Sequence, residues 1–302
     1  MSVRFAILMP SAEGKEPGGN PLAPDMFDYR SSNTFNYFSD LNAERRTLID
    51  ALQRYIAAED DLEKFFGVKD ETLREAVEAN QAIYNSPLMA AIDRYGPGVM
   101  YQAMEFAALP TGAQRRLLEN GVIFSGLFGL LRPDDLIPNY RLKMDATVEE
   151  IGKVSRYWRP HLSPALNSLL TGKAVWNLLP GTHEDAWEDD QSYAQLYRLK
   201  FYKEQDGERK PVTHGVKELR GNLVHFIVTE LADSVEALED WEAPGGYEVD
   251  YEASELDQKG GTIVMVSSPG WEKRRKARQK MRAEIEAEKR ARREAAAADD
   301  DE

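Results

Sequence analysis

The chain of 302 residues contains no cysteine. Disulfide bonds, thiolate catalysis, and zinc or iron–sulfur sites ligated by cysteine are therefore excluded. The sequence also lacks any apolar run that approaches the roughly 18 residues of a membrane-spanning helix, and no charged-then-apolar leader precedes its first apolar stretch. These absences predict a soluble cytosolic protein that does not associate with membranes.

Histidine and the common catalytic motifs are scarce as well. None of the four histidines has the spacing of HExxH or of another metal-binding motif. A GxSxG nucleophile elbow, a Rossmann fingerprint and a Walker loop are also missing. The sequence therefore predicts no metal site and no cofactor, and it assigns no catalytic residue.

Positive charge is missing from most of the chain. The formal net charge is −14. Residues 271–294 contribute +6, from eleven Lys or Arg and five Glu, and residues 299–302 contribute −4, which leaves −16 for residues 1–270. A broad basic face on this body is excluded, so any anion-binding surface must be a local pocket that concentrates positive charge.

The charged C-terminal segment is distinct from the rest of the chain. After residue 270 the only large apolar residues are Trp271, Met281 and Ile285, which form no stripe that could pack on a core. We therefore predict a domain at residues 1–268 and a helical or disordered tail at residues 269–302. The sequence carries no signal for the oligomeric state.

Strand and helix patterns are mixed along residues 1–268, which predicts an α+β domain with a central sheet flanked by helices. Short apolar runs predict strands at 3–9, 122–123, 174–179, 196–202, 247–252 and 262–267. Helical periodicity predicts helices at 42–66, 69–84, 111–118, 147–170 and 212–231.

Capping residues indicate where two of these helices begin. Thr147 followed by Glu150 forms the pattern of a capping box, and Thr213 is the expected cap of the helix over 212–231. Pro160 and Pro164 lie inside the pattern of the first helix, so a break or kink is expected there.

Residues 124–144, FSGLFGLLRPDDLIPNYRLKM, are the most informative stretch. Gly126 and Gly129 permit close backbone approach or positive φ, and two prolines fix the following turns. Arg132, Tyr140 and Arg141 are left as polar groups on a rigid, irregular loop, where binding residues concentrate. The alternative is that the glycines and prolines only shape a connection and the arginines face water.

The paired aspartates of this loop have two interpretations. Asp134 and Asp135 could bind a metal ion, but paired aspartates in a proline turn more often cap the turn. The capping interpretation is the one we adopt.

Three other groups of residues are candidates for phosphate binding. Lys15, between Gly14 and Glu16, resembles a phosphate-gripping lysine, although the pattern is not GxxxxGK[ST] and a plain loop is the alternative. Trp158 and Arg159 belong to an aromatic and basic cluster suited to base stacking and phosphate contact, or to the ordinary edge of a core helix.

The third group lies at the start of the helix over 212–231. His214, Lys217 and Arg220 recur at intervals of three residues and share one side of this helix. A helix N-terminus with added cations favours an anion, whereas the alternative is a solvated charged face.

The central loop carries a family resemblance. Residues 125–142, SGLFGLLRPDDLIPNYRL, resemble the signature of the YaaA peroxide-stress family (the DUF328 group). AILMPSAEGK at 6–15, the segment 157–160 with Leu162, Asn177 with Leu178, and VTHGVKELRG at 212–221 resemble further family segments in the same order. The similarity covers about residues 3–268, and one departure is NLLPGTHEDAW, where the family has N-L-A-S-x-E-Y.

The resemblance implies a function that the residues alone do not. Family members are cytosolic, limit oxidative DNA damage during peroxide stress, and are related to lowering free intracellular iron. Their fold is a single α+β domain with a helix-hairpin-helix-like element and a positively charged cleft that binds double-stranded DNA. The positions that match are Ser11 or Glu13 with Lys15, then Arg132, Asp135, Tyr140, Arg141, Lys217 and Arg220.

Two hypotheses of function follow. In the first, a non-enzymatic protein binds the phosphates of double-stranded DNA in one cleft, and Tyr140 or Trp158 stacks or packs there. In the second, an enzyme binds a nucleotide or another phosphorylated ligand, with Glu13, Asp135 or His214 as acid or base. Both predict that five cations from separate segments face one cleft: Lys15, Arg132, Arg141, Lys217 and Arg220.

Overall fold

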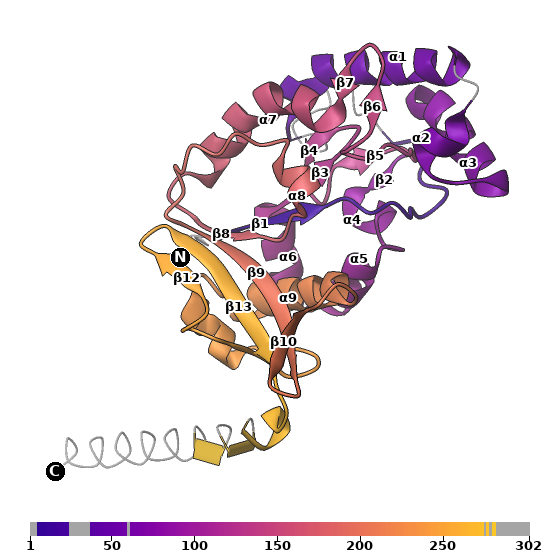
Figure 1. Ribbon diagram of the computed structural model, residues 1–302. Helices are drawn as coiled ribbons and strands as arrows, with labels where there is room; N and C mark the ends of the chain where they lie inside the picture. The colour runs from indigo at the N-terminus through magenta and orange to yellow at the C-terminus, as the bar shows by residue number, and fades with distance from the viewer. Residues whose placement is uncertain (1–4, 24–36, 59–60, 275, 278–279, 282–302) are drawn as a thin grey trace.

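A large mixed β-sheet forms the centre of the molecule. The computed structural model describes residues 5–23, 37–58, 61–274, 276–277 and 280–281. The strand order is β11 (Tyr247–Val249), β13 (Gly260–Ser267), β9 (Gln195–Gln205), β8 (Ala174–Asn177), β1 (Phe5–Pro10), β3 (Gly121–Ser125) and β4 (Gly129–Leu131). β10 (Glu208–Pro211) pairs with β9, and β12 (Glu255–Asp257) pairs with β13 (Figure 1).

The middle of this sheet is parallel. β1 lies between β3 and β8 and is parallel to both, β9 is parallel to β8, and β13 is parallel to β9. β1 is apolar and almost wholly buried, as expected for a strand covered on both faces. Because these strands are parallel, their carboxyl ends meet at one edge of the sheet, which is where ligands bind in open α/β sheets.

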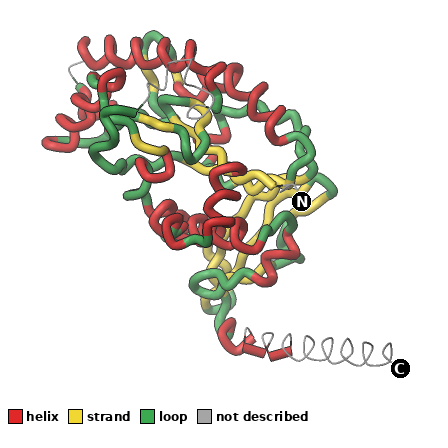
Figure 2. Tube along the Cα trace, turned by 180° about the vertical axis from the view of Figure 1, so that it is seen from behind, coloured by secondary structure: helices red, strands yellow, loops and turns green. Residues whose placement is uncertain are grey.

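Helices cover both faces of the sheet. They are α1 (Asn42–Ala58), α2 (Leu62–Phe66), α3 (Asp70–Gln81), α4 (Ala91–Arg94), α5 (Val99–Met104), α6 (Thr111–Asn120), α7 (Val154–Leu170), α8 (Gly181–Glu184) and α9 (Val216–Glu230). α5, α6 and α9 lie together on one side and α7 lies on the other (Figures 1 and 2). The predicted α+β class, with a central sheet flanked by helices, is confirmed.

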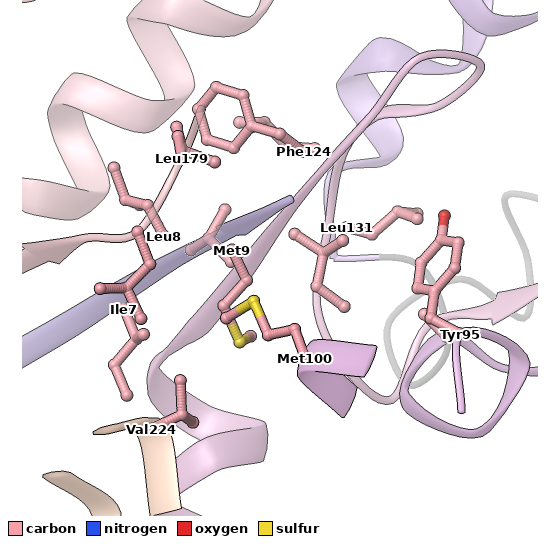
Figure 3. Close-up of a cluster of buried hydrophobic side chains, with 14 of the residues drawn as sticks. Ile7, Leu8, Met9, Tyr95, Met100, Phe124, Leu131, Leu179 and Val224 are labelled. Carbon is pink, nitrogen blue, oxygen red and sulfur yellow. The ribbon is translucent and has the colours of Figure 1, made fainter. Parts of the chain in front are cut away.

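The side chains of β1 alternate between two apolar layers. Figure 3 shows Ile7 and Met9 on the side of Val224 and Met100, which belong to α9 and α5, and Leu8 on the opposite side. All of these side chains are at most 5% exposed. The strand therefore joins the two layers of the core.

The predicted helix over 147–170 is wrong in its first two turns. Residues 147–153 form a small hairpin of β6 (Thr147–Val148) and β7 (Gly152–Lys153), and α7 begins only at Val154. Gly152 has a φ of 77°, a turn conformation that a helix does not contain, and Glu150 pairs with Arg54 on α1 rather than capping a helix. Of the expected break or kink at the two prolines, the break is wrong, because α7 continues through both of them.

Two other predicted helix limits need correction. The predicted helix over 42–66 is two helices, α1 and α2, and the side chain of Asp61 accepts a hydrogen bond from Lys64 N at the start of α2. Thr213 does not cap α9. Gly215, with a φ of 85°, stands at the cap position and α9 starts at Val216.

The sequence pattern predicted close backbone approach or positive φ at Gly126 and Gly129, and the structure confirms this prediction. A Cβ at Gly126 would lie 2.5 Å from the backbone oxygen of Leu142, and one at Gly129 would lie 2.8 Å from the ring of Trp158. Gly129 also has a φ of 69°. Both positions therefore require glycine for close approach.

Most of the predicted tail lies outside the described residues. Its first turn contacts the body, since Trp271 packs over Gly246 and the guanidinium of Arg274 lies 3.2 Å from the carboxylate of Glu248. The domain boundary at residue 268 stays a prediction. In the part of the chain that the structure describes, no helix is both long enough and apolar enough to cross a bilayer.

We predict that Gly221→Ala destabilises the fold. α9 crosses α5 at this residue, and an added Cβ would collide with the backbone oxygen of Met100. Overpacking of this kind costs about 1–3 kcal/mol, which outweighs the gain in helix propensity of about 1 kcal/mol. Urea unfolding measures the change. Glu218→Ala, on an exposed position of the same helix, is the control and should stay within about 0.5 kcal/mol of the wild type.

A cation-lined cavity as the candidate binding site

A cavity of about 610 Å³ lies beyond the carboxyl ends of β1 and β8. Four segments that are far apart in the sequence line it. They are the loop after β1 (residues 10–15), the start of α5 with the turn before it (97–101), the end of the central loop (141–145), and the segment 180–183 after β8. Two side chains of α9, Lys217 and Arg220, complete the wall. The parallel strands thus bring distant segments to one place.

Four of the five predicted cations line this cavity. Lys15, Arg141, Lys217 and Arg220 come from the loop after β1, the central loop and α9. Lys143, which the sequence analysis did not select, joins them. This local concentration of positive charge contrasts with the net charge near −16 of residues 1–270, and it has the form that the charge distribution requires of any anion-binding surface.

Arg141 is held at the edge of the cavity by an acidic partner. Its terminal nitrogen donates to Glu13 Oε2 at 3.2 Å, and Lys143 Nζ lies 3.6 Å from the other oxygen of the same carboxylate. Arg141 Nε is buried and makes no hydrogen bond with any residue in the described part of the chain. A single carboxylate therefore faces two cations, which leaves donor capacity for an anionic ligand.

Lys15 lies at the base of the cavity. Its Nζ donates to the backbone oxygens of Ala12 at 3.0 Å and Glu13 at 3.4 Å. The same nitrogen lies 4.2 Å from the ring centre of Tyr140 and 5.6 Å from that of Tyr95, within range of a cation–π contact. The loop that carries Lys15 is therefore fixed by its own backbone and by an aromatic floor.

The environment of Lys15 favours the neutral amine. Burial lowers the pKa of Lys15 from 10.5 to about 7, and the positive charge of Arg141 adds to this effect. Glu13 acts in the opposite direction and Arg94 in the same direction as Arg141. Near neutral pH this lysine is therefore divided between its two protonation states.

Tyr140 belongs to a buried chain of hydroxyl groups. Its hydroxyl lies 2.6 Å from that of Tyr95 and 2.7 Å from Ser125 Oγ, which also accepts a hydrogen bond from Phe128 N. Tyr140 is 2% exposed, so its ring supports Lys15 from below and is closed to a nucleic-acid base. Of the two expected roles, stacking or packing, the structure therefore favours packing for Tyr140.

His183 is a cavity residue that the sequence analysis set aside. It lies on α8, in the segment that departs from the family pattern, and lines the same cavity as Lys15. Burial lowers its pKa to about 4, so the imidazole is neutral at physiological pH. His214, which we selected as a possible acid or base, is exposed and does not line the cavity.

Arg132 does not line the cavity, which corrects the prediction that all five cations would face one cleft. Two nitrogens of its guanidinium donate to the backbone oxygen of Leu118, at 3.1 and 2.9 Å. The guanidinium also lies over the ring of Tyr37, 4.7 Å from its centre. Arg132 therefore joins the central loop to the end of α6.

Asp135 caps a turn, as expected, and is not a cavity residue. Its carboxylate accepts hydrogen bonds from Arg132 N at 2.7 Å and from Tyr37 N at 2.9 Å. Burial raises its pKa to about 6, while the positive charge of Arg45 acts against this shift. The role of acid or base proposed for Asp135 has no support in this geometry, because the carboxyl group is fully buried.

The aromatic and basic cluster of α7 is structural. Trp158 is fully buried and its indole nitrogen donates to the backbone oxygen of Gly126 at 2.8 Å, so it cannot stack on a base. Arg159 donates to the backbone oxygen of Asp185 at 2.9 Å. The alternative interpretation of this cluster, the edge of a core helix, is the better one.

A pair of helices lies beside the cavity. α2 and α3 pack on each other and are joined by a three-residue turn in which Gly67 has a φ of 65°. The helix-hairpin-helix-like element that the resemblance implied stays a prediction, and α2–α3 is the helix pair beside the cavity to which it could apply. A Cβ at Gly67 would lie 3.3 Å from Lys143 Nζ, so the turn is adjacent to the cavity edge.

The described residues offer no evident metal centre. Among residues 5–23, 37–58, 61–274, 276–277 and 280–281, no three His, Asp or Glu side chains gather in a way that could hold a metal ion.

Comparison with known proteins places the chain among stress proteins. The family model described as peroxide stress protein YaaA matches residues 5–253. A UPF0246 protein of Corynebacterium glutamicum is 33% identical over 225 residues, covering 73% of this chain and 84% of the relative. A UPF0246 protein of Streptomyces coelicolor is 27% identical over 264 residues, covering 84% of this chain and 94% of the relative.

We predict that Arg132→Ala destabilises the protein. The change removes the hydrogen bonds to Leu118 O and the contact with Tyr37. Hydrogen bonds to charged groups contribute about 1.5–3 kcal/mol, so a loss of that order is expected in urea unfolding. Arg115→Ala is the control, because its side chain is 79% exposed on α6. Equal stability of the two variants would show that Arg132 is not a structural residue.

We also predict a pH-dependent stability contribution from Lys15. Between about pH 7 and its ordinary value of 10.5, the unfolded chain holds a proton at Lys15 that the folded protein lacks. The free energy of unfolding therefore rises with pH in this window, by at most about 1.4 kcal/mol per pH unit for one proton. Lys15→Met lacks this rise, so its stability relative to the wild type should fall from pH 7 to pH 9.

Urea unfolding at pH 7, 8 and 9 measures this trend. Lys69→Met is the matched control, since the Lys69 side chain is 75% exposed. Its stability should follow that of the wild type at each pH. Parallel curves for Lys15→Met and the wild type would mean that Lys15 has an ordinary pKa.

Proposed function

The chain belongs to the peroxide stress protein YaaA family, and on this premise we propose that it protects DNA by holding duplex phosphates at the cation-lined cavity. The binding is non-enzymatic and takes place in the cytoplasm. The cations contact phosphates, which carry no base identity, so binding is independent of sequence and sensitive to salt.

The observation that supports this proposal is the convergence of cations from separate segments. Arg141, Lys143, Lys217 and Arg220 gather around one cavity, whereas the remaining body is strongly acidic. Lys217 lies in the first turn of α9, where the helix dipole adds to the attraction for an anion. Such an arrangement attracts a phosphate group to the cavity, while the negative charge of the rest of the body repels phosphates from other parts of the protein.

The helix pair α2–α3 extends the contact surface for a duplex. Its turn at Gly67 is adjacent to Lys143, so one strand could follow both the turn and the cavity edge. Backbone N–H groups of such turns are suited to phosphate oxygens. The proposed contact area is therefore larger than the cavity itself.

The bound protein would protect DNA by displacing metal ions from the phosphates that it contacts. Ferrous ions are attracted to the same phosphates that the lysine and arginine side chains would occupy. A protein that neutralises phosphates releases the cations condensed there. We therefore propose that bound protein limits iron-dependent damage by keeping iron away from the duplex, with no iron site in the protein.

A second candidate function is supported by the size of the cavity. Its volume of about 610 Å³ falls within the range of small-molecule sites, about 300–1,000 Å³. The neutral imidazole of His183 and the amine of Lys15 face the same space, together with the phosphate-binding cations. The alternative is thus an enzyme that acts on a nucleotide or another phosphorylated ligand.

The salt dependence of DNA binding tests the first candidate. We predict that Lys217→Ala and Arg220→Ala each weaken binding to unrelated duplexes to the same extent. Each variant should also reduce the slope of log affinity against log salt by about 0.9, the value for one lost phosphate contact. Fluorescence anisotropy at several salt concentrations measures both quantities. Arg115→Ala, on an exposed face of α6, is the control for a lost surface charge.

Unchanged affinity and slope in both variants would contradict the proposal for this cavity. If the wild type binds no duplex, but pyrophosphate raises its melting temperature and the two variants abolish that shift, the second candidate is favoured. Thermal unfolding of each variant without ligand separates a lost contact from a lost fold.

A further inference from the structure

We infer that Lys15 is a nucleophile that forms an imine with an aldehyde carrying a neighbouring phosphate group, as the opened sugar at an abasic position in DNA does. This inference rests on the proposed function of the same cavity and adds a substrate class to it. It concerns the cavity cation that donates to backbone oxygens of its own loop, Lys15.

The position of the amine supports this role. Lys15 Nζ makes hydrogen bonds to the backbone oxygens of Ala12 and Glu13, and within the described chain it forms no ion pair with a carboxylate. Lys143, by contrast, is paired with Glu13 at the cavity edge. An amine that faces a cavity without a carboxylate partner is free to react with a ligand.

The charge state of the amine supports the same role. With a pKa of about 7, a large share of Lys15 is neutral near neutral pH, whereas an ordinary lysine is almost wholly protonated there. Burial is the main cause of this shift; Arg141 and Arg94 also favour the neutral form, and Glu13 favours the charged form. Desolvation beside other cations is how lysine nucleophiles are activated.

The loop of Lys15 is rigid enough to present the amine reproducibly. Arg94 is fully buried and donates to the backbone oxygens of Glu16 and Gly18, at 2.9 Å for the latter. The rings of Tyr140 and Tyr95 close the space under Nζ. The amine therefore has aromatic rings beside it and the cavity in front of it.

The cations of the wall would hold the phosphate of such a ligand. Arg141, Lys217 and Arg220 line the same cavity, and Arg141 Nε has no protein partner among the described residues. An intact nucleotide bears a base on C1′ and offers no aldehyde. An abasic nucleotide costs little to extrude because it has lost its pairing and stacking, and its opened form exposes the aldehyde at C1′.

The reaction balances without a further reagent. The lone pair of Nζ forms a bond to the aldehyde carbon, and the carbonyl π electrons move to its oxygen. The nitrogen loses a proton while the oxygen gains one, which gives a carbinolamine. The nitrogen lone pair then expels the hydroxyl group as water after a second proton transfer, and a carbon–nitrogen double bond remains. His183, neutral and in the same cavity, is placed to carry these protons.

Reductive trapping tests the inference. The full chain is incubated with sodium cyanoborohydride and a duplex containing one abasic position, or with the same duplex intact. A parallel arm uses glyceraldehyde 3-phosphate, which carries the same chemistry as a free metabolite. Denaturing electrophoresis and peptide mass mapping detect the reduced adduct.

We expect an adduct at Lys15 with the abasic duplex and none with the intact duplex. Lys15→Arg keeps a positive charge and Lys15→Gln removes it, and both should abolish the adduct. Lys69→Gln, far more exposed at 75%, should leave the yield unchanged. An adduct at Lys15 with glyceraldehyde 3-phosphate alone would assign the aldehyde to a free small molecule.

The inference is overturned if neither aldehyde is trapped, if mapping places the adduct on another amine, or if both Lys15 variants retain it. Binding of the intact duplex, measured separately by mobility shift, tests the proposed function. Duplex binding without an adduct refutes only the role of Lys15, and an adduct with glyceraldehyde 3-phosphate without duplex binding refutes only the DNA proposal.

Discussion

The buried guanidinium of Arg45 determines the shape of the central loop. It lies on α1, donates to the backbone oxygens of Phe128 at 2.9 Å and Leu130 at 2.7 Å, and is attracted by the carboxylate of Asp135. Burial lowers its pKa to about 10, which indicates how costly the desolvation is. Removing one partner of such a group costs about 3–5 kcal/mol, so the loop has little freedom to change. Further along the same loop, the ring of Tyr140 lies beside Lys15, and residues 141–143 line the cavity.

The positively charged side chains around the cavity repel one another. Arg141 and Lys143 share one carboxylate, Glu13. Burial, and after it the positive charge of Arg141, lowers the pKa of the neighbouring Lys15. An anion that enters relieves this repulsion and supplies the missing hydrogen-bond acceptors. This crowding is the physical reason for proposing a phosphate group as the ligand of the cavity.

Sequence patterns predicted the elements better than the roles of single residues. The buried strand at β1, the glycine contacts of the central loop and the capping role of Asp135 follow from local rules, which depend on neighbours in the chain. Arg132 and Trp158 were assigned to the site because their residue types suit phosphate and bases. Their partners, a carbonyl of Leu118 and one of Gly126, are backbone atoms that no residue pattern reveals. Lys143 and His183 were missed for the same reason, since only the fold brings them to the cavity. The hairpin of β6 and β7 was not predicted, because Thr147 and Glu150 have the spacing of a capping box and this spacing indicates the start of a helix.

The parallel pairing of β1 has a consequence for the synthesis of the chain. β1 is made before both of the strands that it pairs with, because these begin only at Gly121 and Ala174. Until both of these strands have been made, β1 is an apolar strand with two unpaired edges. Its pairing then requires long-range contacts, which are slow to form. The nascent protein is thus most vulnerable to aggregation in the interval before the segment that contains β8 has been made.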